Sequence, residues 1–295
     1  MNSLRKRASK GLKFARRRPQ YRQVAVITMA IATVTFLVVQ WPAAASAHAA
    51  QYRATPSDLS GSYPIGTPDS AEPSVYGPPN ATAMVGYNLS YVNDFTSPTL
   101  PSGWDVFTGV PGADPGGHFG ISHVVVNDGV LELNTYRDPA WHNRWVTGGL
   151  CQCGVAQRYG AYFVRSRISR PGPNEAELLW PAGKVWPPEI DFNETGGTTA
   201  STSTSVHFGK ANTIVRSHIF IDMTQWHTWG VIWTPKYILY TVDGSVWGSF
   251  RVASEISRVK MTLDFEQRQI CVEHRQCPTA PTSMLIDWVA EYART

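Results

Sequence analysis

The segment Glu189–Glu194 constrains the fold of this chain more than any other feature, because it places three carboxylates within six residues that otherwise have the pattern of a buried β-strand. Its first four residues alternate between acidic and apolar side chains, which is the period of two expected of a strand. Charged side chains are costly inside a sheet. The pattern therefore predicts a strand with one face in the core and one acidic face.

Glu194 does not fit this alternation, because five residues separate it from Glu189 and a regular strand would turn it toward the apolar face. A charged glutamate would then be buried without a partner. A β-bulge, in which Phe192 and Asn193 together oppose one residue of the neighbouring strand, returns Glu194 to the acidic face. We therefore predict a bulge at Phe192-Asn193.

Several acids on one face of a strand point to the chemistry of a retaining glycosidase. In such enzymes one carboxylate attacks the sugar, and a second, about 5 Å away, donates a proton to the leaving group. Like charges this close do not readily ionise together, so one carboxyl group stays protonated near neutral pH. A third acid between them can share a proton. A surface acidic strand and a calcium site are the alternative interpretations of the spacing.

The segment resembles the bulged E-x-D-x-x-E signature of glycoside hydrolase family 16, the laminarinase and lichenase relatives. The resemblance covers roughly residues 90–295. Segments similar to parts of that family are Tyr159–Arg167, Ala176–Pro181, Trp186–Glu194, Trp226–Trp229, Trp233–Pro235, Tyr240–Gly244 and Ile286–Val289. One departure is Pro188, which stands where many members have Gly. Because proline removes a ladder donor, we expect an edge or an irregular strand entry there.

This resemblance implies that Glu189 is the nucleophile, Asp191 an assisting acid and Glu194 the general acid/base. It also implies an all-β fold, a β-jelly-roll sandwich of two antiparallel sheets of the concanavalin type, with a substrate groove across its concave face. The implied substrate is a β-1,3- or mixed β-1,3-1,4-glucan. No cofactor is required, although the family often carries a structural calcium ion, for which Asp287 is the candidate ligand.

Short apolar segments separated by turn signals dominate the rest of the chain. Val124–Val126 and Val130–Leu133 flank Asn127-Asp128-Gly129, which is a hairpin signature, and Ile238–Val242 followed by Asp243-Gly244 repeats it. No long segment has a convincing helical period. The chain is therefore predicted to be all-β independently of the resemblance.

The first 47 residues have the pattern of an export signal. Nine basic residues precede a 16-residue apolar stretch, Val24–Val39, and Ala45–Ala47 is a candidate cleavage site. A membrane span needs about 20 apolar residues. We therefore expect a secreted, extracellular protein, and an uncleaved leader that keeps it at the cell wall or membrane is the alternative.

Removal of this leader changes the charge of the chain. It leaves 17 basic and 22 acidic residues, a net charge of −5, since nine of the 26 Lys and Arg and none of the 22 Asp and Glu lie in the leader. A basic, nucleic-acid-binding protein is thereby excluded, and an uncharged polysaccharide suits the surface. Residues 48–87, rich in Pro, Gly and Ser, are predicted to be a linker or tail. Residues 88–295 are predicted to form one catalytic domain, which we expect to be a monomer.

Aromatic residues near the acids are candidates for sugar contacts, because sugars stack their C–H faces on such rings and bond through hydroxyl groups at the rims. We expect Trp180 and Trp186 to form groove walls. His207, on the strand predicted to follow the acidic one, is a candidate partner for sugar hydroxyls or for the assisting acid. The remaining candidates are Asn174, Arg165, Trp141 and Trp145. For each of these residues, packing in the fold is the alternative.

Four cysteines fit an exported protein. Closure of a loop by Cys271 and Cys277 is easy, whereas a bridge between Cys151 and Cys153 is expected to be strained, and cross-pairing stays open. A zinc site that uses these cysteines and His274 is a further alternative, although the spacing fits no common pattern.

Two other functions stay open at this point. An acceptor sugar in place of water would make the same site a transglycosylase. A non-catalytic, lectin-like carbohydrate-binding module would need the aromatic residues but not the pair of glutamates.

Overall fold

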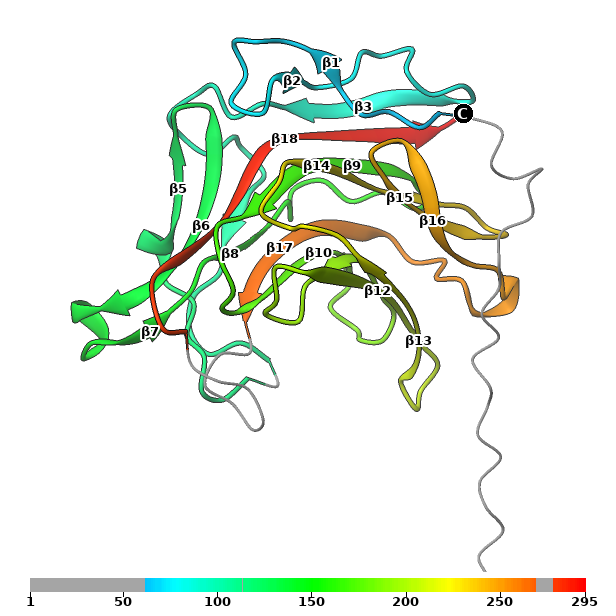
Figure 1. Ribbon diagram of the computed structural model, residues 1–295. Helices are drawn as coiled ribbons and strands as arrows, with labels where there is room; N and C mark the ends of the chain where they lie inside the picture. The colour runs from blue at the N-terminus through cyan, green and yellow to red at the C-terminus, as the bar shows by residue number, and fades with distance from the viewer. Residues whose placement is uncertain (1–61, 113, 269–277) are drawn as a thin grey trace, which may run out of the picture. The chain divides into compact units, whose positions relative to one another are not determined.

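Two antiparallel β-sheets packed face to face make up the computed structural model, which describes residues 62–112, 114–268 and 278–295 (Figure 1). The helices among these residues are three short 3-10 turns, η2 (Ile121–His123), η3 (Pro139–Trp141) and η4 (Ala253–Glu255). None of the helices in this part of the chain has the length and apolar character that a membrane crossing needs. The predicted all-β sandwich is confirmed.

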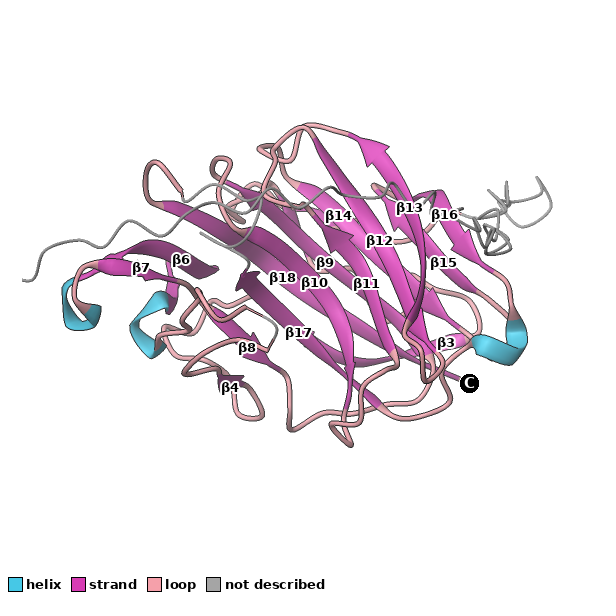
Figure 2. Cartoon of the chain, turned by 90° about the horizontal axis from the view of Figure 1, so that it is seen from below, coloured by secondary structure: helices cyan, strands magenta, loops and turns pink. Residues whose placement is uncertain are grey.

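The seven-stranded sheet bends so that its outer face is concave, and Figure 2 looks onto this face. Its order is β13-β12-β11-β10-β17-β8-β4, with every pair antiparallel. The strands are β13 (Thr213–Phe220), β12 (Ser201–Phe208), β11 (Glu189–Glu194), β10 (Asn174–Pro181), β17 (Met261–Arg268), β8 (Gly149–Cys151) and β4 (Asp105–Val106).

The second sheet, which we call the convex sheet, has the order β16-β15-β14-β9-β18-β6-β5, with β3 paired to β18 and β7 to β6. Its strands are β16 (Ser245–Phe250), β15 (Ile238–Val242), β14 (His227–Trp233), β9 (Gly160–Ile168), β18 (Thr282–Arg294), β6 (Val130–Asp138), β5 (Val124–Asn127), β3 (Tyr87–Asn93) and β7 (Arg144–Val146). Long strands β9 and β18 lie at its centre.

The main core lies between the sheets and is built from one alternating face of each strand. On β11 the core-facing side chains are Ile190 and Phe192, both fully buried. Leu263 and Phe265 of β17 and Trp229 of β14 belong to the same cluster. Because successive strand residues point to opposite faces, burial of these apolar residues turns the intervening acidic ones toward the concave face.

The predicted bulge is present. Asp191 pairs with Ser205 and Glu194 pairs with Ser203, so the two residues Phe192 and Asn193 occupy the space opposite a single residue of β12. The extra residue shifts the register on the β10 side as well. Glu194 is thereby returned to the face that carries the other two acids.

Both predicted hairpins are also present. β5 pairs with β6 across a turn in which Asp128 and Gly129 have φ of 48° and 77°. β15 pairs with β16 across Asp243 and Gly244, with φ of 46° and 81°. Positive φ at both central positions is the requirement of the tight turn that matches the twist of the flanking strands, and Asp-Gly meets it at low cost.

The expectation of a linker over residues 48–87 is wrong for the described residues 62–87. This segment contains the small pair β1 (Thr67–Pro68) and β2 (Tyr76–Gly77) and lies on the outer face of the convex sheet (Figure 1). Trp288 Nε1 donates to the Tyr76 carbonyl at 2.8 Å, and the Tyr292 hydroxyl donates to the Asn80 carbonyl at 3.0 Å. A second apolar cluster, which includes Met84, lies between the segment and the sheet.

The structure contains one of the cysteine pairings that the sequence left open. Cys151 and Cys153 are bonded to each other, with their Cα atoms 5.0 Å apart, at the end of β8. Cys271, Cys277 and His274 lie outside the described residues, so the predicted bridge between residues 271 and 277 stays a prediction.

Candidate active site

A cavity of about 510 Å³ lies on the concave face, over the middle of the seven-stranded sheet. Strands β10, β11, β12, β13 and β17 all contribute to its walls. The structure brings together seven of the predicted site residues here: Glu189, Asp191, Glu194, Trp180, Trp186, His207 and Asn174. Their chemical roles stay a prediction, but their convergence in one cavity is a feature of the fold.

Alternation on β10 and β11 explains which side chains reach the cavity. On β10 the residues Asn174, Ala176, Leu178 and Trp180 line it, whereas Glu175 and Glu177 between them are buried. On β11 the period of two holds for the first two acids, and the bulge restores it for Glu194. A one-residue extension of a single strand therefore aligns all three carboxyl groups on one face.

Glu189 lies beside an aromatic wall. Trp186 Nε1 donates a hydrogen bond to Glu189 Oε2 at 2.6 Å, and the Trp186 ring lies nearly parallel to that of Trp180, at 14° and 6.5 Å between centroids. Burial raises the pKa of Glu189, and repulsion from Asp191 raises it further, whereas the Trp186 bond and His207 lower it. The ionisation of Glu189 therefore depends on Asp191, Trp186 and His207.

Asp191 is buried beneath the cavity and is paired with a histidine. His207 Nδ1 lies 2.8 Å from Asn212 Oδ1, and His207 Nε2 lies 3.4 Å from Asp191 Oδ2. Because an amide oxygen only accepts, Nδ1 is the donor to Asn212. Burial raises the pKa of Asp191 and His207 lowers it. Burial lowers the pKa of His207, but bonds to Asp191 and Asn212 and attraction to Glu189 outweigh this and raise it. Asn212 therefore orients the ring toward Asp191.

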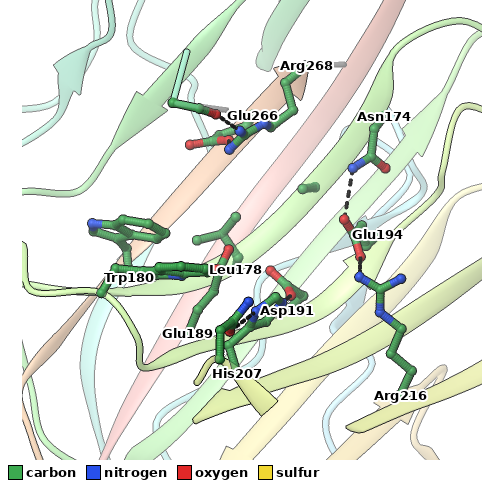
Figure 3. Close-up of a pocket in the computed structure, with 14 residues that line it drawn as sticks. Asn174, Leu178, Trp180, Glu189, Asp191, Glu194, His207, Arg216, Glu266 and Arg268 are labelled. Atoms are coloured by element: carbon green, nitrogen blue, oxygen red, sulfur yellow. Dashed lines mark hydrogen bonds and ion pairs between the residues drawn. The ribbon is translucent and has the colours of Figure 1, made fainter. Parts of the chain in front are cut away.

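Glu194 lies at the opposite end of the acidic row, away from Trp180 (Figure 3). Asn174 Nδ2 donates to Glu194 Oε1 at 2.9 Å, and Ser205 Oγ donates to Glu194 Oε2 at 3.4 Å. Arg216 Nη2 lies 4.0 Å from the same Oε2 atom. Asn174 also accepts from the Gly196 backbone N–H at 2.7 Å, so it ties the glutamate to the loop after β11.

A chain of buried polar groups supports the bulge from behind. Asn193 Nδ2 donates to Glu177 Oε1 at 3.1 Å, and Ser166 Oγ of the convex sheet donates to the same oxygen. Thr202 Oγ1 donates to Asn193 Oδ1 at 2.6 Å and accepts from the Glu194 backbone N–H at 2.9 Å. Burial raises the pKa of Glu177 to about 8. The chain thus joins the second sheet to the backbone of Glu194.

A fourth acid and a second arginine complete the cavity. Arg268 Nη1 donates to Glu266 Oε2 at 3.0 Å, and both residues line the wall formed by β17. Burial raises the pKa of Glu266, and its bond to Arg268 lowers it. Asp264, two residues earlier on β17, is buried, and burial, followed by repulsion from Glu266, raises its pKa well above the usual range.

Arg165 is not part of this cavity, contrary to the prediction. It lies on β9 of the convex sheet, where its guanidinium donates to Ser74 Oγ at 2.5 Å, to the Ser74 carbonyl at 3.1 Å and to Thr228 Oγ1 at 3.1 Å. Its guanidinium carbon lies 4.7 Å from the centre of the Tyr76 ring. The side chain therefore binds the segment 62–87 rather than substrate.

Trp141 and Trp145 do not line the cavity either. Trp145 is buried on β7 with Arg137 over its ring at 5.0 Å, so it is a packing residue. Trp141 is 44% exposed at the end of η3, where its ring centroid lies 3.6 Å from that of His118. Trp141 belongs to the connection between β6 and β7, and Trp145 belongs to β7 itself, which pairs with β6 of the convex sheet.

The sequence interpretation missed Glu266, Arg268, Arg216 and Asn212. The first two carried part of a signal, because Asp264, Glu266 and Arg268 alternate with apolar or amide residues in the same way as the acids of β11. This alternation does not show that β17 and β11 belong to the same sheet. Arg216 belongs to a similar alternation on β13. Asn212, in the turn before β13, carries no such pattern, and only its bond to His207 reveals it.

A jelly-roll sandwich of this kind is also the fold of solved laminarinases. The catalytic domain of a laminarinase from Thermotoga maritima superposes with a TM-score of 0.62 at 15% identity, over 71% of this chain and 99% of that one. The laminarinase from Rhodothermus marinus superposes with a TM-score of 0.62 at 19% identity, over 71% and 98%. At these identities the likeness concerns the fold.

Sequence comparison identifies the family itself. Residues 118–284 match the profile of Glycosyl hydrolases family 16, and the chain belongs to this family. Among characterised proteins, the chain is similar to the endo-1,3-1,4-beta-glycanase ExsH of Rhizobium meliloti (strain 1021), with 34% identity over 93 residues, or 30% of this chain. The match spans 20% of the length of that relative.

Proposed function

We propose that this protein is a secreted, retaining endo-glycosidase that hydrolyses a β-linked polysaccharide, with a β-1,3- or β-1,3-1,4-glucan as substrate. The observation that carries the proposal is the convergence of Glu189, Asp191 and Glu194 in one cavity through the bulge of β11. Membership of the family and the name of the similar R. meliloti protein, an endo-1,3-1,4-beta-glycanase, support this choice of substrate.

In the first step Glu194 protonates the glycosidic oxygen while the Glu189 carboxylate attacks the anomeric carbon. The bond between the anomeric carbon and the leaving oxygen breaks, and an ester bond to Glu189 forms. Glu189 must be ionised for this attack. Asp191, bonded to His207 and next to Glu189, is placed to hold the proton that these two buried carboxyl groups share.

In the second step Glu194, now ionised, removes a proton from water, and the water oxygen replaces Glu189 at the anomeric carbon. Two inversions return the original anomeric configuration. An acceptor sugar in place of water would give transglycosylation on the same residues. Asn174 and Ser205 support Glu194 in either case, because each donates to one of its oxygens.

The aromatic wall suits the sugar bound on the Glu189 side. Trp180 and Trp186 line the cavity next to Glu189, and Trp186 is 42% exposed. Sugar C–H faces stack on such rings. Because the Trp186 indole N–H is already bonded to Glu189, binding of a sugar against this ring would also fix the nucleophile.

The experiment that tests the function is a panel of laminarin, lichenan, agarose and xyloglucan assayed for new reducing ends, with Glu189→Gln as the control. We expect cleavage of laminarin or lichenan, an early fall in viscosity from internal cuts, and a first product with the β configuration by NMR. The variant should bind the polymer without turnover. Equal behaviour of both proteins, with binding and no cleavage, would instead support a lectin-like module.

We also propose that Asp287 is a carboxylate ligand of a structural calcium ion. Asp287 is fully buried on β18, and burial raises its pKa, whereas Ser74 and Arg165 lower it. Within the described ranges, one group of three acidic, histidine or cysteine residues has its possible ligand atoms within 4.8 Å of one another, and Asp287 does not belong to it. It consists of Asp105 and the bonded Cys151 and Cys153. Backbone carbonyls would therefore have to complete a site at Asp287. A fall in melting temperature with EDTA that calcium reverses, and that is absent in Asp287→Asn, tests this.

Export and the monomeric state are further parts of the proposal. The basic and apolar leader supports export, and N-terminal sequencing of the exported protein distinguishes cleavage after Ala47 from an uncleaved anchor. Light scattering tests whether the protein is a monomer.

A further inference from the structure

The edge strand β13 carries a row of exposed side chains on the same face as the catalytic acids. Ile214, Arg216, His218 and Phe220 are exposed, whereas Val215 and Ile219 between them pack against the main core. Alternation therefore turns the exposed set toward the concave face. Arg216 lines the cavity directly, which confirms this orientation for the middle of the row.

The register of the sheet aligns this row with the acids. Asp191 pairs with Ser205 and Ser205 with Arg216, while Glu194 pairs with Ser203 and Ser203 with His218. β13 is thus two strand spacings, roughly 10 Å, from β11. One pleat further along, Phe220 pairs with Ser201, beyond the end of the acidic row.

Phe220 therefore lies near the end of the acidic row that is formed by Glu194. Figure 3 shows Trp180 and Arg216 on opposite sides of the acids, with Glu194 next to Arg216. A general acid delivers its proton to the leaving oxygen, so the sugar that leaves lies on the side of Glu194. The substrate chain that enters past Trp180 and Trp186 therefore continues toward β13 after the bond that is cleaved.

The chemistry of these side chains suits a sugar. Phe220 is 83% exposed, which is unusual for a large apolar residue. His218 Nδ1 lies 3.1 Å from Ser203 Oγ, and the His218 and Phe220 rings are 4.8 Å apart at 85°. The Arg216 side chain is 56% exposed, with donors for hydroxyl groups. Together they offer an aromatic ring for a C–H face and polar atoms at its rim.

We infer that Arg216, His218 and Phe220 form a binding site for the sugars on the leaving-group side of the polysaccharide, with Phe220 as the stacking ring. This rests on the proposed function and deepens it. The site would also bind an acceptor sugar, so it would favour transglycosylation over hydrolysis when acceptor is abundant.

The test compares Phe220→Ala with wild type on two substrates. Lichenan or laminarin, whichever the wild type cleaves faster, occupies the sugar-binding sites on both sides of the cleaved bond. A nitrophenyl β-glycoside of an oligosaccharide from the same polymer fills only the Glu189 side, because its leaving group carries no sugar. We expect kcat/KM on the polymer to fall about tenfold, the upper end of what one aromatic contact contributes, and kcat/KM on the nitrophenyl glycoside to stay within about twofold.

Phe220→Tyr, which keeps a stacking ring, should retain the wild-type rate on the polymer. Ile121→Ala, which truncates an exposed apolar residue on η2, is the control for surface truncation and should leave both rates unchanged. Equal loss on both substrates in Phe220→Ala, or no loss on the polymer, would overturn the inference. A wild type that cleaves neither substrate would instead contradict the proposed function.

A second copy of this chain is the other occupant that an exposed edge strand could accept. Light scattering of wild type and Phe220→Ala distinguishes the two. We expect the same mass for both proteins. A wild-type dimer that dissociates in the variant would assign Phe220 to an interface between copies and contradict its role toward sugar.

Discussion

The outer faces of the two sheets both carry buried charged groups, but they use them differently. On the concave sheet Glu189, Asp191 and Glu194 line an open cavity. On the convex sheet Arg165 and Asp287 lie beneath the segment 62–87, where Arg165 binds Ser74. A charged group on a sheet face is therefore accessible to a ligand where the face stays open, and it holds a covering segment where the face is covered.

The largest expected effect is the loss of activity in Glu194→Gln. A positioned general acid/base contributes about 10²–10⁴-fold to rate, so we expect kcat on the polymer to fall by that factor. The melting temperature should stay within about 2 °C of wild type, because the Gln oxygen still accepts from Asn174. Initial rates and thermal unfolding measure the two quantities.

Glu132→Gln, an acid on β6 of the convex sheet, is the matched control and should leave both quantities unchanged. If Glu194→Gln kept wild-type turnover, the concave face would be open but not catalytic, and the two faces would no longer differ in function.

The next effect in size concerns the covered face. Arg165→Met removes bonds from a guanidinium to Ser74 and Thr228, and bonds to charged groups are worth about 1.5–3 kcal/mol each. We expect the free energy of unfolding to fall by about 4–5 kcal/mol, the sum of three such bonds at the low end of that range, while kcat per folded molecule stays the same. Urea unfolding with active-site titration measures this.

Arg258→Met, at an exposed arginine, should change the stability by less than about 0.5 kcal/mol. A selective loss of kcat in Arg165→Met, with stability unchanged, would return Arg165 to the role of a substrate residue and remove the distinction between the two faces.

A smaller effect is expected from the polar chain behind the bulge. Thr202→Val keeps the shape of the side chain but removes the acceptor for the Glu194 N–H and the donor to Asn193. Small displacements of a catalytic group are costly, up to about 10²-fold. We expect kcat to fall about 10-fold, with KM within about twofold.

Thr202→Ser, which keeps the hydroxyl, should restore most of the rate. A purely structural role for the Thr202 hydroxyl would lower stability in Thr202→Val and leave the kcat of the folded enzyme unchanged.

The last effect is one of pH on stability. Burial raises the pKa of Glu177 from 4.5 to about 8. The folded state therefore holds a proton that the unfolded state has lost between these values, so this group's contribution to stability falls as pH rises from about 4.5 to 8. The slope for one group is at most about 1.4 kcal/mol per pH unit.

Glu177→Gln cannot ionise, and its amide oxygen still accepts from Ser166 and Asn193. We therefore expect the variant to gain stability over wild type as pH rises from 5 to 8. Melting temperatures at pH 5, 6.5 and 8 measure the difference, and a difference that does not change with pH would contradict the buried, protonated state of Glu177.

The acidic strand shows how far a sequence pattern can predict a site. The alternation in Glu189–Glu194 and the cost of burying a charge are both properties of adjacent residues, so the strand, its bulge and the common face of its acids could be predicted. Trp180, Trp186 and Asn174 followed because they lie near the acids in sequence. Glu266 and Arg216 could not be assigned, because periodicity tells which residues share a face but not which strand becomes a neighbour of β11.

Arg165 and the segment 62–87 illustrate the opposite case. The segment has no apolar period, and its hydrogen bonds to the sheet are largely accepted by backbone carbonyls, those of Ile65, Ser74, Tyr76 and Asn80. Every residue has such a carbonyl, so composition gave no signal, and a docked segment was predicted to be a linker. The arginine was assigned to the wrong face for the same reason.

The sequence by itself determined the β period, the hairpin turns and the bulge that keeps Glu194 out of the core, because each depends on steric and solvation costs within a few residues. Only the tertiary structure decided which face was covered, which strands flank β11, and that β13 extends the cavity on the Glu194 side. These features depend on contacts between residues far apart in the chain, whose pairing is selected by the packing of the whole sandwich.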